Sequence, residues 1–393
     1  MRSFLLYSKY KVDFIVEQKV IFDGTKQSSS VTSFNHSFDF DYKRETKNLY
    51  KIMKQCTVAH TIDIQYILNF LSSFDSEQRL ILVRELEFQH DYKLVDSILA
   101  EKDSLLRSCT LALIMESEEL YSRNFHDLLH NAYTTHYRSL LEILLTMNKE
   151  DMKKFKDYYK QIYTCSVESD VKNIVTTPTI FYNLILAMLE EQRSEQISHS
   201  ATSAKQIAKL LYEAGEGTPG LDHETFIQTF AVDSFSQLSA IFDEYEDKYG
   251  KPINVAINQK FTHQIERESF EDIIQYTRNP ATYFSNILHK SLNENPIDYT
   301  SLIRIIIGHS EKDLCEIALE YSKLFELLEQ TISKQIETGE IKKLFLKLVT
   351  NGHSSDIQTQ HSNGQSSHTG MRRNRSQEAL DKVLYTLKGI RHQ

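Results

Sequence analysis

The stretch AGEGTPGLD, residues 214–222, is the part of the chain whose composition most clearly offers chemistry. It holds three of the 11 glycines among 393 residues and joins two amphipathic segments. A glycine-rich turn lets backbone carbonyls converge on a hard cation such as Ca²⁺, which takes roughly six to eight oxygen ligands. The same composition also suits a helix C-cap and turn that bind nothing. The glycines alone leave both interpretations open.

Histidine and cysteine, the other reactive residue types, lack the spacing that catalysis or metal binding would require. The chain has 15 histidines but no HExxH, P-loop, GxSxG, or GxGxxG followed by a strand. Cys56 and His60 are neighbours only in sequence, and a small buried thiol is the commoner use of such a cysteine. No CxxC pair exists to indicate a disulfide framework or a zinc site, since the cysteines are Cys56, Cys109, Cys165 and Cys315. We therefore expect no enzyme activity.

Charge and hydropathy limit the possible partners. A net charge of −9 argues against nucleic acid and against attraction of the whole molecule to anionic lipid, so a membrane contact would be local or bridged by a cation. The longest apolar runs, such as LALIM and LIRIII, are far shorter than the ~20 residues that cross a bilayer. The N-terminus carries Lys9, Lys11 and Asp13 where a secretory signal needs an apolar core. We expect a cytoplasmic protein, peripheral at membranes.

The elements that must position the glycine-rich loop are expected to be helices in a repeated order. Apolar residues recur mostly at i, i+3 and i+4, which predicts an all-α fold. Four Ile- and Leu-rich segments begin at residues 62, 136, 222 and 299, so successive starts are 74, 86 and 77 residues apart. Each precedes a longer charged helix, for which the expected N-caps are Ser76, Asn148, Ser234 and Ser310.

Across roughly residues 44–350 the sequence resembles the annexin family. The most specific phrases are LYEAGEGTPGLDHETFIQTF, DSFSQLSAIFDEYEDKYGKPINVAI and RNPATYFSNIL, followed by SLIRIIIGHSEKDL and TGEIKKLFLKL. The first repeat is recognisable from SEQRLILVRELEFQHDYKLVDSILAE, and the second is the most divergent. The resemblance implies an all-α fold of four five-helix repeats that form a curved disc, whose convex face binds acidic phospholipid through calcium.

The resemblance also predicts how the chain is divided. We expect repeats at 44–115, 116–192, 202–279 and 280–350, with a variable head at 1–43, an inter-repeat linker at 193–201, a flexible linker at 351–370 and a basic amphipathic helix at 371–393. In annexins the head recruits partners. The basic helix is of a type that docks on anionic membrane or in a partner groove, although it could instead fold back on the core.

The resemblance implies a calcium site in the third repeat, and the sequence departs from it. Carbonyl oxygens would come from Gly215, Thr218 and Gly220. The carboxylate that completes an annexin loop site falls on Lys260, a cation that would repel calcium. Glu266 matches the acidic residue of a weaker annexin site, where it is joined by the carbonyls of Asn258 and Phe261.

The other repeats are incomplete in different ways. Glu101 occupies the acidic position of the first repeat, but its partnering loop QCTVAHT contains no glycine. The second repeat shows NAYTT in place of the glycines and no site. In the fourth, NENPID replaces the loop, and Glu337 is about one residue out of step with the acidic position. We expect few and weak sites for the Ca²⁺ cofactor.

These residues favour a calcium-dependent phospholipid-binding annexin, a peripheral membrane binder or organiser whose partner is an acidic phospholipid membrane surface. The alternative is an annexin-fold scaffold that has lost calcium chemistry and binds protein or cytoskeletal partners through its head or its C-terminal helix. A third possibility is calcium-independent membrane attachment through residues 371–393. The residues that discriminate between calcium binding and its loss are Lys260, which disfavours calcium, and Glu101 and Glu266, which could bind it.

Overall fold

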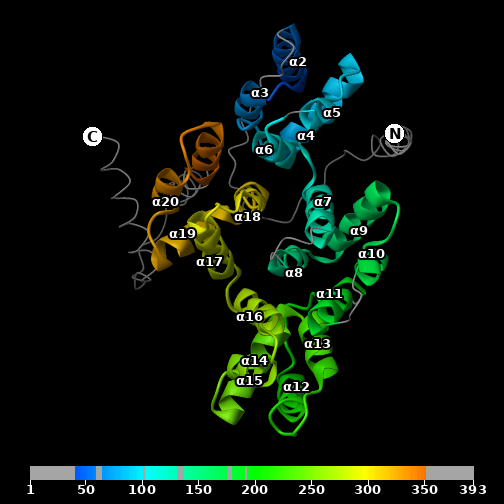
Figure 1. The fold of residues 1–393 in the computed structure, drawn as a ribbon, viewed down its shortest axis with the longest axis vertical. Coiled ribbons are helices and arrows are strands. Elements are labelled where there is room, and N and C mark those ends of the chain that lie inside the picture. The colour runs from blue at the N-terminus through cyan, green and yellow to red at the C-terminus, as the bar shows by residue number, and fades with distance from the viewer. Residues whose placement is uncertain are drawn as a thin grey trace, which may run out of the picture. The chain divides into compact units, whose positions relative to one another are not determined.

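The computed structural model describes residues 40–58, 64–100, 102–130, 137–174, 179–190 and 193–350, which all belong to one compact unit, Ser33–Gln393. Every regular element in these ranges is a helix, which confirms the all-α prediction (Figure 1). None of these helices combines the length and the apolar character needed to span a bilayer. The expected linker at 351–370, the basic helix at 371–393 and nearly all of the expected head lie outside the described residues.

The helices follow one another in four sets of five. The first set is α2 (Tyr42–Val58), α3 (Ile64–Leu71), α4 (Ser76–His90), α5 (Leu94–Leu99) and α6 (Ser104–Ile114). The second set is α7 (Ser117–His130), α8 (Tyr137–Leu145), α9 (Lys149–Tyr163), α10 (Val167–Ile174) and α11 (Ile180–Glu190). The third set is α12 (Ala201–Ala214), α13 (His223–Val232), α14 (Phe235–Tyr249), α15 (Ile253–Lys260) and α16 (Gln264–Arg278).

The fourth set keeps this order with one irregular helix. It consists of α17 (Pro280–Asn293), α18 (Tyr299–Leu302) continued by the π-helix η1 (Ile303–Ile307), α19 (Leu314–Leu324), α20 (Leu328–Gln335) and the helical residues 340–350. A π-helical turn is wider than an α-helical one and is uncommon in proteins. Here it carries Arg304, the largest fully buried side chain of the described residues.

A stacked pair of rings recurs in each set, between its first helix and the end of its third. The ring centroids lie 3.6 to 4.0 Å apart with interplanar angles of at most 5°. The first members are 76, 86 and 77 residues apart, close to the period of the sequence. The four pairs are Tyr50–His90, His126–Tyr163, Tyr212–Tyr249 and His289–Phe325.

Two of the four expected N-caps are confirmed. Asn148 accepts a hydrogen bond from the N–H of Asp151 at 2.9 Å, and Ser234 accepts one from the N–H of Gln237 at 3.1 Å. Both caps satisfy a backbone donor that the first turn of a helix leaves without an intrahelical partner. The sequence therefore located the starts of α9 and α14.

The other two predictions were wrong. The N-cap of α4 is Asp75, one residue before Ser76, and it forms a capping box with Gln78. Ser310 caps nothing, because its hydroxyl donates back to the carbonyl of Ile307 at 2.8 Å and α19 begins only at Leu314. At α4 the stronger local cap is the acidic residue one position earlier, whereas at α19 the π-helix η1 and the turn after it move the helix start.

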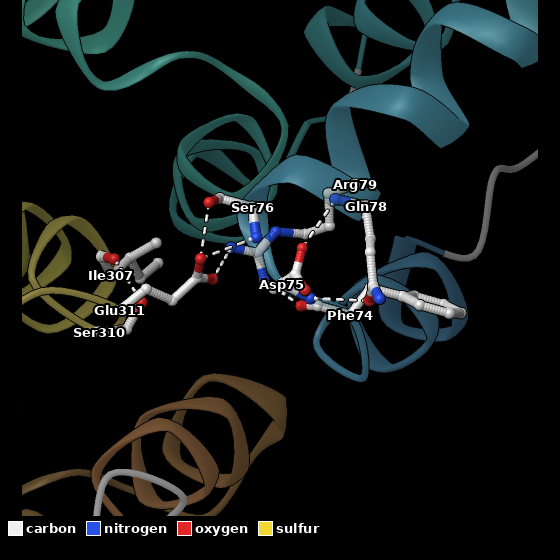
Figure 2. A network of polar contacts seen from close by, with 8 residues as sticks. All are labelled: Phe74, Asp75, Ser76, Gln78, Arg79, Ile307, Ser310 and Glu311. Atoms are coloured by element: carbon white, nitrogen blue, oxygen red, sulfur yellow. Dashed lines mark hydrogen bonds and ion pairs between the residues drawn. The ribbon is translucent and has the colours of Figure 1, made fainter. Parts of the chain in front are cut away.

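Apolar side chains form two core clusters, each built from two sets. One cluster combines the first set with the fourth, which is farthest from it in sequence, and the other combines the second set with the third. Figure 2 shows the polar contact between the first and fourth sets, where Glu311 accepts from Arg79 Nη2 at 2.8 Å and from the N–H and hydroxyl of Ser76 at 2.9 and 2.6 Å. A carboxylate at the start of α4 is favoured by the helix dipole.

The two clusters are joined by a buried ion pair. Arg304 of η1 donates from Nε and Nη2 to the two carboxylate oxygens of Glu142 on α8, at 2.7 and 2.8 Å. Nη2 also reaches the hydroxyls of Ser139 and Ser301 at 3.1 and 3.0 Å. The side chains of Arg304 and Glu142 are 2% and 4% exposed, so neither charge has water as an alternative partner.

Removing one partner of this pair should destabilise the fold strongly. We expect Glu142→Gln to lower the free energy of unfolding by about 3–5 kcal/mol, because it leaves a buried guanidinium uncompensated. The control is Glu190→Gln, which breaks the half-exposed pair with Lys172 and should cost about 1 kcal/mol or less. Urea unfolding of both variants would measure this, and equal losses would contradict a special role for the buried pair.

Candidate functional site

The glycine-rich loop between α12 and α13 is closed by backbone hydrogen bonds to both helices. Gly215 is the C-cap of α12, and its N–H donates to the carbonyl of Leu211 at 3.1 Å. The N–H of Gly217 donates to the carbonyl of Tyr212 at 2.7 Å. Asp222 is the N-cap of α13, and its N–H donates to the carbonyl of Ala214 at 2.8 Å. The C-cap interpretation of the glycines is thus correct, and it fixes the loop that would offer carbonyls.

The glycines are needed to different degrees. A Cβ on Gly217 would lie 3.1 Å from Glu213 Cα, and one on Gly215 would lie 3.3 Å from the carbonyl oxygen of Leu211. A Cβ on Gly220 would meet no atom within 4 Å. Close approach therefore favours glycine at 215 and 217, whereas the surroundings of Gly220 leave room for a side chain.

Lys260, at the end of α15, points its ammonium at the loop. Its Nζ donates to the carbonyl oxygen of Thr218 at 3.4 Å, while the Thr218 hydroxyl donates to the carbonyl of Glu213 at 2.9 Å. The carbonyl that the family resemblance assigns to calcium thus faces a cation of the chain itself. The lysine does more than repel a metal from a distance, because it contacts one of the oxygens a metal would use.

Glu216, an acidic residue of the loop, already interacts with two other side chains. Glu216 accepts a hydrogen bond from the Tyr245 hydroxyl at 2.8 Å and pairs with the ammonium of Lys251. Burial and the hydrogen bond to Glu216 raise the pKa of Tyr245, so this hydroxyl stays protonated and donates. Glu216 therefore fastens the loop to α14 and to the residues after it.

Glu266 lies in the first turn of α16 and is 5% exposed. Among the described residues its carboxylate has no hydrogen bond or ion pair. The neighbouring Arg267 donates from Nη1 to the carbonyls of Phe261 and Thr262 at 2.9 and 2.7 Å. One of the two carbonyls expected to accompany Glu266 is therefore already bonded to a guanidinium.

Arg267 was missed by the sequence analysis. A cation in the first turn of a helix is unfavourable to the helix dipole, so its position there was a signal that it has a specific partner. The partner is the turn before α16, whose carbonyls at Phe261 and Thr262 accept from Arg267, while Lys260 reaches the glycine-rich loop. Both halves of the expected third-repeat calcium chemistry thus contain a positive side chain.

The remaining expected sites are described only in the fourth set. Glu101 and residues 59–63, which belong to its expected partnering loop, lie outside the described residues, as do residues 131–136 of the second set. In the fourth set, Gln335 donates from Nε2 to Asn293 Oδ1 at 2.8 Å, which brings the end of α20 next to the loop that follows α17. Burial of Tyr299, with the exposed Glu337 nearby, raises the pKa of that hydroxyl.

Known proteins similar to this chain form a consistent group. A family model described as Annexin matches residues 206–267, which contain the glycine-rich loop and Glu266. Annexin A13 of Mus musculus is 27% identical over 317 residues, which cover 81% of this chain and 97% of that protein. Annexin III matches with a TM-score of 0.75 at 24% identity and covers 82% of this chain and 99% of its own.

A calcium-bound structure of annexin (Sm)1 matches with a TM-score of 0.68 at 19% identity, over 82% of this chain and 93% of that one. At these identities the structural matches show the fold alone, and the sequence matches cover most of the chain. The order of five helices, found four times, agrees with both. Over about four-fifths of its length the chain is similar to annexins in both sequence and fold.

Proposed function

We propose that this annexin binds acidic phospholipid surfaces peripherally, with calcium as a bridging ion at few and weak sites. Annexins in general bind phospholipid in a calcium-dependent way, and the matched annexin (Sm)1 structure is calcium-bound. With a net charge of −9, a bridging cation gives this chain the attraction to anionic lipid that it lacks as a whole. Such attachment is reversible, which suits a cytoplasmic protein that works at membranes.

The contact between Lys260 and the Thr218 carbonyl supports the proposal that calcium binds weakly at the third-repeat loop. Calcium affinity follows the number and charge of the oxygen ligands, and a full annexin loop site would have a carboxylate where this chain has an ammonium. Calcium can reach the loop only if Lys260 moves away, and it then gains no charged ligand from that position. Occupancy therefore depends on lipid phosphate or water to complete the coordination.

Glu266 is the carboxylate best placed to hold an ion in the third set. It is buried and has no partner among the described residues, while the basic groups beside it bind backbone carbonyls instead. We also assign Glu101 to a site in the first repeat, and Gly215, Thr218 and Gly220 to the third-repeat loop. The basic segment 371–393 is proposed as a second attachment point, to lipid or to a protein partner.

Replacing Lys260 should sharpen the calcium dependence. In co-sedimentation with phosphatidylserine vesicles, we expect Lys260→Glu to reduce the calcium concentration for half-maximal binding about tenfold, because it supplies the missing charged ligand. Lys260→Gln removes the cation without adding a ligand and should give a smaller shift. Lys205→Glu on α12, which makes the same charge change far from the loop, is the control. Equal shifts for Lys205→Glu and Lys260→Glu would reduce the effect to net charge.

Neutralising the assigned carboxylates should have the opposite effect. We expect Glu266→Gln and Glu101→Gln each to raise the calcium needed for vesicle binding several-fold, because each removes a charged ligand. Glu246→Gln, at an exposed position on α14, is the matched control and should leave binding unchanged. If both variants bind like the wild type at every calcium concentration, these two assignments are wrong.

The basic C-terminal segment needs a separate test. The full chain and a chain ending at Asn351 should both bind the same vesicles only when calcium is present. Binding by the full chain alone, indifferent to chelator, would move the membrane function to residues 371–393. Absence of binding by both would favour the calcium-independent scaffold.

A further inference from the structure

A cluster of metal-binding side chains lies in the second set, separate from the expected calcium loops. His126 and His130 come from α7 and Asp170 comes from α10, and one ligand atom of each lies within 4.8 Å of the others. We propose that these three residues form a site for a divalent transition-metal ion, with Zn²⁺ as the first candidate. This proposal goes beyond calcium and phospholipid binding and does not depend on them.

The ligand types suit zinc and do not suit calcium. Two imidazole nitrogens and one carboxylate oxygen are a common zinc set, whereas Ca²⁺ prefers oxygen ligands throughout. His126 and His130 are four residues apart, so they lie on one face of the helix. Tetrahedral zinc with bonds of about 2.0–2.1 Å needs its ligand atoms about 3.3 Å apart. Without an ion, the three ligand atoms already lie within 4.8 Å of one another.

A buried tyrosine hydroxyl on the inner side of the site orients the carboxylate of Asp170. Asp170 Oδ2 accepts a hydrogen bond from the fully buried Tyr159 at 2.5 Å and lies 2.9 Å from His130 Nε2. Burial of Asp170 opposes ionisation, but the hydrogen bonds from Tyr159 and His130 outweigh it and lower the pKa of the carboxyl group. An ionised carboxylate oriented by a hydroxyl is the outer-shell arrangement that metal sites use.

His126 has a fixed ring and an available nitrogen. Its imidazole stacks on Tyr163 with centroids 3.6 Å apart, and its buried Nδ1 has no hydrogen-bond partner among the described residues. Asp127 Oδ1 lies 3.6 Å from that nitrogen, which is too far for a hydrogen bond. No other described side chain therefore occupies this nitrogen, which can offer its lone pair to an ion.

The equivalent positions of the other sets supply an internal comparison. In the third set the ring pair is Tyr212–Tyr249, and the acid below it, Glu216, pairs with Lys251. In the fourth set His289 takes the ring position and its Nδ1 lies 3.1 Å from the hydroxyl of Tyr321. The frame of stacked rings and a buried tyrosine is shared, but the described parts of those sets do not gather two histidines and a carboxylate.

An ion can reach the site from solvent. The side chain of His130 is 42% exposed, whereas that of Asp170 is only 12% exposed. The site therefore has an open outer side and a closed inner side, and water would take the remaining coordination position. Further titratable groups nearby are Asp127, Tyr163 with Arg123 beside it, and the thiol of Cys165, whose pKa is raised by burial and by Asp170.

The test uses the full chain with Co²⁺ as a spectroscopic probe and Zn²⁺ as its competitor. We expect visible absorption of tetrahedral Co²⁺ that Zn²⁺ abolishes and that Ca²⁺ at the same concentration leaves unchanged. His130→Gln, at a partly exposed position, should keep the helical circular dichroism and weaken binding at least tenfold. His289→Gln, the matched change in the fourth set, should leave binding intact. Unchanged affinity in His130→Gln, or equal loss in both variants, overturns the proposal.

A further variant separates this site from adventitious binding to other histidines. Tyr159→Phe removes only the hydroxyl that orients Asp170 and should weaken the affinity for Zn²⁺ by roughly 10- to 100-fold. Affinity that is insensitive to Tyr159→Phe would place the ion elsewhere.

Discussion

The pairing of Arg304 with Glu142 is the contact on which the arrangement of the two core clusters depends. A buried guanidinium without a carboxylate costs several kcal/mol, so α8 and η1 can pack only in the register that brings these side chains together. Arg304 lies in the π-helical turn, and its side chain enters the interior from there. The first and fourth sets are then fastened at a second point, where Glu311 reaches Arg79 and the start of α4.

Local signals explain what the sequence could predict. The all-α class and the repeat length follow from apolar periodicity, and the caps Asn148 and Ser234 act on donors within three residues. The error at Ser76 is one of a single residue, because the local capping box is formed by Asp75 and Gln78. The N–H and hydroxyl of Ser76 instead donate to Glu311, 235 residues away, and Ser310 follows a π-helical turn.

In the candidate sites, too, the sequence predicts local features but does not predict contacts between distant residues. The charge of Lys260 is enough to show a departure from the family pattern, but its hydrogen bond to the Thr218 carbonyl needs the fold, since the two residues are 42 positions apart. His126 and His130 stand at helical spacing and could have been noticed as a pair. Their third ligand, Asp170, comes from another helix, and no local pattern links it to them.

The four sets share one frame and differ in the polar residues beside it. The stacked rings recur in all four sets. In the third set, lysine and arginine side chains donate to carbonyls, one of which the family resemblance assigns to the calcium loop, so these carbonyls have partners without a metal. In the second set, two histidines stand beside a carboxylate that a buried tyrosine hydroxyl orients. The same frame thus carries different polar groups in different sets, and these groups find their partners within their own set.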